Sequence, residues 1–308
     1  MPPVVAFAPG RVEILGNHTD YNEGFVLSAA IEEGMVFAAG PSDEPGQSCL
    51  YAADLDREVR FRTEAPAPDP ASRWANYSKG MLHLLSRGTS RVTDFRAVFG
   101  GNVPMGAGLS SSAALEVSTG LALARLMNLS VPRLKMAQLA QQAEIEFSGT
   151  RCGLLDQISS LYGEAGSLVF TDFRTLEAHS AHMPDSACFL LCNTGVKHSL
   201  VDSEYNERRA SCEAVAKQLA HLLNRPVRAL RDVSPEEWAA VADRVESTPR
   251  LRAAHVIGEN DRVLRGKAAM ERGDVEEFGR CMTASHESSR HSFENSCTEL
   301  DQAVEAVL

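Results

Sequence analysis

The segment PMGAGLSSSAALEV, residues 104–117, holds the residues with the clearest chemical potential in this sequence. Glycines at the start of a helix allow a turn that brings backbone N–H groups close to a ligand. The first N–H groups of a helix lack internal partners and carry the positive end of the helix dipole, so a phosphate fits there. The residues that would form this cradle are Gly106, Gly108, Ser110, Ser111 and Ser112. The pattern predicts a nucleotide-phosphate site that is not of the Walker type, because no GK[ST] follows; an ordinary turn before a helix is the alternative.

A second segment, APGRVEILGNHTDYNEGFVL (residues 8–27), gathers polar side chains among turn-forming residues. These side chains are Arg11, His18, Asp20, Tyr21 and Asn22. A polyhydroxylated ligand requires paired hydrogen-bond donors and acceptors of this kind. The segment is therefore a candidate binding loop for such a ligand, and an exposed polar loop is an equal alternative.

A third segment, EIEFSGTRCGLLDQISSLYG, places a carboxylate among apolar residues. Asp156 follows Leu154 and Leu155 directly, so we expect it to be partly buried. A buried carboxylate must be paired or hydrogen-bonded, since otherwise it takes up a proton. Arg11 is a natural counter-ion for it. The alternative is a helix cap in a turn that also holds Gly153.

The elements that must position these residues follow from periodicity and from turn signals. We predict strands over 4–8, 25–30, 35–39, 95–99, 166–172 and 187–193, with a further β-prone stretch over 50–61. We predict helices over 74–85, 111–127, 132–147, 204–223, 235–245, 250–270, 274–285 and 297–308. The order indicates an α+β protein of two lobes, with domains at 1–175 and 176–308.

Composition and charge exclude several classes of partner. The 308 residues carry a net charge of −11, which argues against nucleic acid or an anionic membrane as the main partner. We find no secretory leader and no apolar run of membrane-spanning length. The 7 cysteines form no CxxC pair, which favours reduced thiols. We expect a cytoplasmic protein that acts as a monomer.

The three segments together resemble the galactokinase branch of the GHMP small-molecule kinases. APGRVEILGNHTDYNEG resembles the galactokinase signature, PMGAGLSSSAALEV the phosphate-binding motif, and CGLLDQ the segment with the catalytic aspartate. Further matches are WANYSKG at 74–80, NTGVKHSL at 193–200, SEYNERRASCE at 203–213 and SCTELD at 296–301. All of them occur in the family's order, from Pro9 almost to Leu308.

The resemblance implies a two-lobed GHMP kinase fold. Its N-terminal domain would hold a mixed sheet with helices, and its C-terminal domain, ferredoxin-like and helical, would be truncated. The implied reaction is ATP-dependent phosphorylation of a monosaccharide at its anomeric hydroxyl, with D-galactose as the first choice. Phosphoryl transfer depends mostly on positioning and charge neutralisation, which agrees with the residue types present.

The resemblance also implies a role for each matching residue. Asp156 would be the catalytic aspartate near the sugar 1-hydroxyl, and Arg11 would keep it ionised and stabilise charge on the transferring phosphoryl group. The implied sugar contacts are Asn17, His18, Asp20, Gly153 and Tyr205. The implied ATP contacts are Gly106, Gly108, Ser110, Ser111 and Ser112 for the phosphates and Trp74 and Tyr77 for adenine. The implied Mg²⁺ ligands are Ser112 and Glu144.

Asn17 departs from the family's pattern, which usually has glutamate at this position. Asparagine keeps a carbonyl acceptor but loses the negative charge. A hydrogen bond to a charged group contributes about 1.5–3 kcal/mol, against about 1 kcal/mol for a neutral one. Galactose would then bind more weakly, or a related sugar would be preferred: galacturonate, arabinose or N-acetylgalactosamine. Because Asn17 carries no negative charge, it would not repel the carboxylate of a sugar acid as a glutamate would.

A regulator that binds sugar and ATP without catalysis is the alternative from a different class. The presence of both Arg11 and Asp156 argues against it. An assay of ADP release over a panel of sugars separates the three hypotheses.

A second departure is the absence of the family's third motif, a glycine-rich TGGGFGG-type loop. That loop would brace the phosphate region and the sugar loop, and without it we expect strands to expose unpaired backbone and apolar surface. We therefore expect this sequence to be truncated. A version extended by the motif should have much higher kcat, and equal kcat and stability of the two versions would contradict this.

Overall fold

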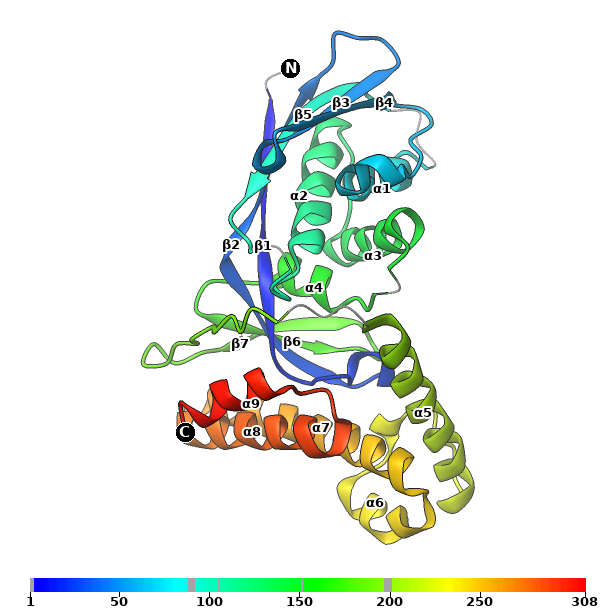
Figure 1. Cartoon of the computed structure of the whole chain (residues 1–308), viewed down its shortest axis with the longest axis vertical. Coiled ribbons are helices and arrows are strands. Elements are labelled where there is room, and N and C mark those ends of the chain that lie inside the picture. The colour runs from blue at the N-terminus through cyan, green and yellow to red at the C-terminus, as the bar shows by residue number, and fades with distance from the viewer. Residues whose placement is uncertain (1–2, 88–91, 105, 151, 197–200) are drawn as a thin grey trace. The chain divides into compact units, whose positions relative to one another are not determined.

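The computed structural model describes residues 3–87, 92–104, 106–150, 152–196 and 201–308, without the side chains of 201–206 (Figure 1). The chain forms two compact units. Unit 1 comprises Met1–Val12 and Ala30–Gly163, and unit 2 comprises Glu13–Ala29 and Glu164–Leu308. This division differs from the single boundary that we predict after residue 175, because the segment 13–29 packs with the C-terminal helices.

The sheet of unit 1 is mixed. Its strands, in the order β4-β3-β5-β2, are β4 (Arg57–Arg62), β3 (Gln47–Ala52), β5 (Phe95–Gly101) and β2 (Phe25–Pro41), and β1 (Val4–Leu15) pairs with β2. The β3–β4 and β2–β5 pairs are antiparallel, and β3–β5 is parallel. Strands β1 and β2 continue into unit 2 through residues 13–15 and 25–29.

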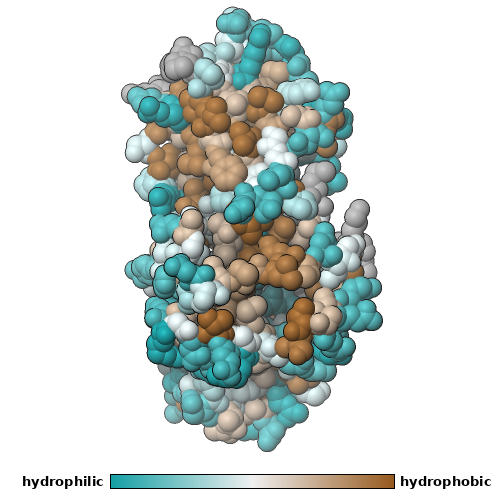
Figure 2. Space-filling view, turned by 90° about the vertical axis from the view of Figure 1, so that its left-hand side faces the viewer, coloured by the Kyte–Doolittle hydropathy of each residue, from teal (hydrophilic) through white to brown (hydrophobic). Residues whose placement is uncertain are grey.

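Alternation along the strands separates the two faces of this sheet. In β5, Phe95 and Phe99 are buried, while Val98 between them is exposed. Helices cover the buried face: α1 (Arg73–Ser86), α2 (Ser111–Leu126) and α3 (Arg133–Ala143), followed by the short α4 (Leu155–Tyr162) (Figure 1). The opposite face carries exposed apolar side chains at Val5, Phe7, Val36 and Val98, and hydrophobic residues gather there in Figure 2.

Helix α2 is buried, as its apolar pattern predicts. A Cβ on its Gly120 would lie 2.5 Å from Met81 Cε and 2.6 Å from Met136 Sδ, so α1 and α3 approach it closely. The Ser78 and Thr119 hydroxyls form a buried hydrogen bond of 3.0 Å between α1 and α2. The helix that follows the glycine turn is therefore packed closely into the core of unit 1.

The helix predicted through Phe147 changes its winding before it ends. After α3, residues Glu144–Ser148 form one π-helical turn. Such turns are rare and frequently occur at functional sites. Here the turn keeps both Glu144 and Phe147 buried.

Unit 2 combines a small sheet with five helices among its described residues. Strands β6 (Ser167–Asp172) and β7 (Glu177–His182) are antiparallel, and β6 also pairs with Phe25–Ser28 of β2. The helices are α5 (Val201–Leu222), α6 (Pro235–Val241), α7 (Ser247–Glu271), α8 (Val275–Ser288) and α9 (Thr298–Glu305). Their core includes Val215, Leu219, Val256 and Phe293. Across the described ranges, none of the helices has the length and apolar character needed to cross a bilayer.

The strand prediction over 187–193 is wrong. Residues 187–193 have no regular structure, and Leu190 is 80% exposed. Strand formation depends on a partner as well as on propensity, and β6 pairs with β2 and β7 instead. The polar strand β7 was not predicted, because its sequence EAHSAH contains no β-branched or large apolar residue. The two strands predicted at 25–30 and 35–39 are one continuous strand, β2.

Candidate active site

An ion pair between Arg11 and Asp156 lies at the centre of the candidate site in unit 1. Arg11 extends from β1, and Asp156 lies in the first turn of α4, 145 positions later in the chain. Arg11 Nε and Nη2 lie 3.0 Å and 2.5 Å from Asp156 Oδ1. The side chains are 14% and 25% exposed, so the pair is largely removed from water. The predicted pairing of these two residues is present.

The same two residues also hold the loop over residues 106–110, which precedes α2 and is called the glycine loop below. Arg11 Nη1 donates a hydrogen bond of 2.6 Å to the carbonyl of Gly108, and the Arg11 backbone N–H donates to the carbonyl of Leu109 at 3.1 Å. Ser110 Oγ donates to the second carboxylate oxygen of Asp156. One carboxylate therefore joins β1, the glycine loop and α4 before any ligand binds.

The glycine loop has the backbone shape that an anion site requires. Gly106 and Gly108 have φ of 75° and 74°, and a Cβ on either would meet no atom of the described residues within 4 Å. Ser110 also adopts the left-handed region, with φ of 58°, immediately before α2. Within the described part of the chain, no side chain caps the N-terminus of α2, and the first N–H groups of a helix can bind a phosphate.

A group of buried acids lies beside the ion pair. Gln157 Nε2 donates to Glu144 Oε2 at 3.1 Å and to Glu116 Oε2 at 3.2 Å, and Cys152 Sγ lies 3.2 Å from Glu144 Oε2. Burial raises the pKa of Glu144, and the charge of Asp156 raises it further, against hydrogen bonds from Cys152 and other side chains. Burial and the charge of Glu144 raise the pKa of the fully buried Glu116 well above its ordinary value. Buried carboxyl groups whose pKa values are raised are stabilised by a proton or by a bound cation.

The oxygen donors at this point fit Mg²⁺. The Ser112 side chain acts to lower the pKa of Glu144, so a hydroxyl and a carboxyl group lie close together at the start of α2. Mg²⁺ binds oxygen ligands, keeps several waters and completes its shell with substrate phosphates. Two protein ligands are therefore sufficient, and the described residues contain no cluster of three or more His, Cys, Asp or Glu side chains suited to a metal.

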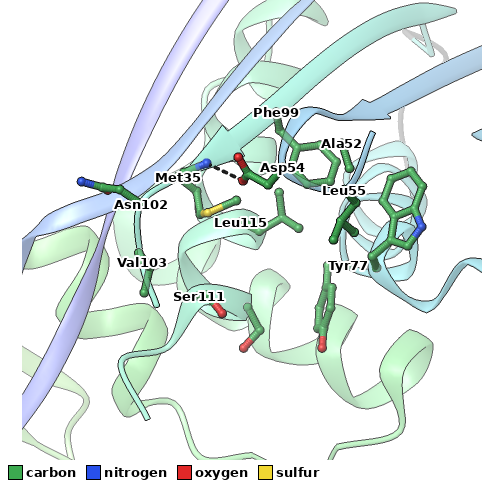
Figure 3. A pocket seen from close by; sticks show the side chains of 13 residues that line it. Met35, Ala52, Asp54, Leu55, Tyr77, Phe99, Asn102, Val103, Ser111 and Leu115 are labelled. Carbon is green, nitrogen blue, oxygen red and sulfur yellow. Dashed lines mark hydrogen bonds between the residues drawn. The ribbon is translucent and has the colours of Figure 1, made fainter. Parts of the chain in front are cut away.

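A cavity of about 400 Å³ in unit 1 opens beside the start of α2 (Figure 3). Its aromatic lining comes from Trp74, Tyr77 and Phe99, and its polar lining includes Ser111 and Ser112. Figure 3 shows Tyr77 and Ser111 at one end and Asp54 and Phe99 at the other. Asp54 Oδ2 accepts a hydrogen bond of 2.8 Å from the backbone N–H of Gly101. An apolar cavity with aromatic walls and a few polar groups has the character of a site for a planar aromatic ring.

In unit 2, the loop that follows β1 is held by the C-terminal helices. The Gly16 N–H donates to Glu259 Oε1 at 2.9 Å, and His255 Nε2 lies 2.9 Å from the Asn17 carbonyl. Gly16 has φ of 111°, and a Cβ there would lie 2.6 Å from the Phe25 carbonyl oxygen, so glycine is required. Burial alone would raise the pKa of Glu259, but Arg262, His255 and hydrogen bonds hold it below its ordinary value.

The predicted sugar residues of this loop have defined surroundings. Asn17 Oδ1 accepts a hydrogen bond of 2.6 Å from Asn295 Nδ2, and both residues line a cavity of about 670 Å³ in unit 2. The His18 ring lies 4.4 Å from the Phe293 ring, centroid to centroid. Burial lowers the pKa of His18 to about 3, and the charges of His255, Arg208 and Arg252 lower it as well. His18 is therefore a neutral ligand group at physiological pH.

The remaining predicted residues are less constrained. Asp20 begins a short 3-10 turn, Asp20–Asn22, in unit 2, and Gly153 immediately precedes α4 in unit 1. The backbone of Tyr205 belongs to α5, but its side chain lies outside the described residues. The roles assigned to the site residues stay predictions.

Sequence reasoning missed several residues that the fold brings to these sites: Asp54, Glu116, Cys152, Gln157, Glu259 and Asn295. Only Glu116 gave a usable signal, since it is the one acid in the apolar helix α2. The others lie in segments where polar residues are ordinary.

Several known proteins are similar to this chain. The family described as GHMP kinases N terminal domain matches residues 76–164, and the family described as Galactokinase galactose-binding signature matches residues 1–41. A galactokinase of Mannheimia succiniciproducens is 39% identical over 304 residues, which is 97% of this chain and 77% of that protein.

Solved structures agree with these matches. The structure of Lactococcus lactis galactokinase complexed with galactose aligns with a TM-score of 0.88 and 31% identity, over 99% of this chain and 79% of that one. Methanococcus jannaschii mevalonate kinase aligns with a TM-score of 0.61 and 17% identity, over 99% of this chain and 83% of that one, which shows a shared fold.

The depressed pKa of His18 predicts a pH-dependent stability. Below about pH 6.5 the unfolded chain binds a proton at this histidine that the folded chain excludes until about pH 3, so stability falls as pH decreases. The contribution approaches about 1.4 kcal/mol per pH unit. His18→Asn should reduce the slope of unfolding free energy between pH 6 and 5, measured by urea unfolding. Equal slopes for the variant and the unmodified chain would contradict the burial of a neutral His18.

Proposed function

Because this chain belongs to the galactokinase family of GHMP kinases, we propose that it transfers the γ-phosphoryl group of ATP to the anomeric hydroxyl of D-galactose. The observation that carries the proposal is the Arg11–Asp156 ion pair, bound to both the carbonyl of Gly108 and the hydroxyl of Ser110. This arrangement fixes a carboxylate and a cation at a loop that suits phosphate. Those are the groups that phosphoryl transfer to an alcohol requires.

The proposed reaction assigns one task to each member of the pair. The anomeric oxygen attacks the γ-phosphorus, the bond to the β–γ bridging oxygen breaks, and ADP leaves with that electron pair. Asp156 orients the attacking hydroxyl and receives its proton. Arg11 neutralises charge on the phosphoryl oxygens, and its hydrogen bond to Gly108 keeps the guanidinium at the loop.

The nucleotide would occupy the cavity of unit 1. Trp74 and Tyr77 would line the adenine, and the proposed phosphate contacts are Gly106, Gly108, Ser110, Ser111 and Ser112. The dipole and free N–H groups of α2 support a phosphate at its start. Ser112 and Glu144 would hold Mg²⁺, which neutralises phosphate charge when bound.

We further propose that Asn17, His18, Asp20, Gly153 and Tyr205 contact the sugar, and that the chain acts as a cytoplasmic monomer with its two lobes at 1–175 and 176–308. All 7 cysteines are free, which suits a reducing compartment where ATP is available.

Replacing the carboxylate tests the proposed reaction. Asp156→Asn keeps the shape of the side chain but cannot accept a proton, so we expect kcat to fall by about 10²–10⁴-fold with galactose. Galactose-dependent ADP release measures the rate. Asp243→Asn is the matched control, because Asp243 is fully exposed and pairs only with Arg250 in the described structure. An unmodified chain that releases no ADP with any sugar of the panel would rule out the kinase proposal.

A sugar acid is the second candidate substrate, and Asn17 is the observation that favours it. Its Oδ1 already accepts from Asn295, so the Nδ2 donors are what the side chain offers to a ligand. An N–H donor binds a carboxylate oxygen well, because a carboxylate only accepts hydrogen bonds. A sugar hydroxyl that donates its hydrogen bond needs an acceptor instead.

The choice between the two substrates can be measured directly. We expect Asn17→Glu to raise the kcat/KM ratio of galactose over galacturonate by about tenfold or more, because a charged acceptor gains about 1.5 kcal/mol with a hydroxyl and repels a carboxylate. Asn295→Ala should change the ratio in the same direction, since it frees Asn17 Oδ1. Complete inactivity of the unmodified chain on galacturonate would eliminate the second candidate.

A further inference from the structure

Glu116 is a buried acid to which the proposed reaction assigns no task. It lies in α2 with no exposed surface, and its Oε2 accepts a hydrogen bond of 3.2 Å from Gln157 Nε2. Its other oxygen, Oε1, is buried and has no hydrogen-bond partner among the described residues. A buried carboxyl that is only partly satisfied costs free energy, so an apolar side chain at this position would be cheaper for the fold alone.

The partner of Glu116 connects it to the catalytic helix. Gln157 follows Asp156 in α4 and is itself fully buried. The Nε2 group of Gln157 has two hydrogens, and it donates to Glu116 at 3.2 Å and to Glu144 at 3.1 Å. Both donors are in use, so the plane of the amide is fixed by two carboxyl groups from two different elements.

The position of Glu116 within α2 closes a ring of side chains. It lies four residues after Ser112, so the two share one face of the helix. The Ser112 hydroxyl in turn lies beside the Glu144 carboxyl and acts to lower its pKa. The ring runs from Ser112 to Glu144, to Gln157, to Glu116 and back along one turn of α2. It joins the start of α2, the π-helical turn and the first turn of α4.

We propose that Glu116 is a positioning residue, which acts through Gln157 to hold the Glu144 carboxyl and the Asp156 turn at a fixed distance from the start of α2. The proposal rests on the proposed function, because it concerns where Mg²⁺ and the phosphates are held. Glu116 touches neither of them; it sets the geometry of the residues that do.

The test compares two replacements of Glu116. Glu116→Met has a similar size but no acceptor, whereas Glu116→Gln keeps an oxygen that can accept from Gln157. We expect Glu116→Met to lower kcat by about 10–100-fold, as is typical when a residue that orients a metal ligand is lost. Mg²⁺ should raise the affinity for ADP in the unmodified chain, and we expect Glu116→Met to reduce that gain by a similar factor. Glu116→Gln should remain within about threefold of the unmodified chain, since it keeps a side-chain oxygen that accepts the hydrogen bond from Gln157. Calorimetric titration of ADP with and without Mg²⁺ gives a readout independent of turnover.

Thr119→Val is the matched control. Thr119 lies in the same helix, is fully buried and loses a comparable side-chain hydrogen bond, the one to Ser78. We expect it to lower the melting temperature without changing the Mg²⁺ dependence of ADP binding. The same loss of Mg²⁺ dependence in Thr119→Val would overturn the proposal, because the effect would then be general destabilisation of α2.

Gln157→Met removes the donor of the Gln157–Glu116 hydrogen bond instead of its acceptor. If Glu116→Met does not fold, Gln157→Met tests the positioning role in its place. In the double variant the two losses should not add, since both break one ring. Additive losses, or single variants that match the unmodified chain in kcat and in Mg²⁺ dependence, would overturn the inference. An unmodified chain without galactose-dependent ADP release would instead count against the proposed function.

Discussion

The carboxylate of Asp156 is the point on which the candidate site of unit 1 depends. One of its oxygens binds the guanidinium of Arg11 and the other accepts from Ser110, so a strand, the glycine loop and α4 meet at one group. Arg11 adds a bond to the Gly108 carbonyl. Charged hydrogen bonds of this kind are short and directional. The site is thus assembled in the protein itself, which lowers the cost of organising it when substrates bind.

The environment of that carboxylate sets the electrostatics of the phosphate site. Glu144 and Glu116 are buried nearby, and burial together with their neighbouring charges raises both of their pKa values. Buried carboxyl groups lower their free energy by binding a proton or a cation. Acids of this kind close to a helix N-terminus suit the proposed binding of Mg²⁺ and phosphate, because a cation and an anion can then be stabilised side by side.

Particular residues show how far sequence reasoning reached. The apolar pattern of α2, its glycine turn and the pairing of Arg11 with Asp156 were all predicted, and the structure contains each of them. The strand at 187–193 was wrong, and the polar strand β7 was missed, because pairing partners decide whether a segment becomes a strand. Glu116 and Gln157 lie within the quoted motifs, but no role was predicted for either, because their importance arises from the contact between α2 and α4.

The sequence by itself determined the chemistry available to this protein: the glycine turn, the unpaired helix start, the cation and the carboxylate follow from residue types and short spacings. Tertiary structure decided the distances between these groups and the shifts of their pKa values. Asn17 pairs with Asn295, which lies 278 positions away, and His18 loses its charge through burial against Phe293. Burial and long-range pairing are properties of the packed chain, since desolvation requires neighbours that a local pattern does not contain.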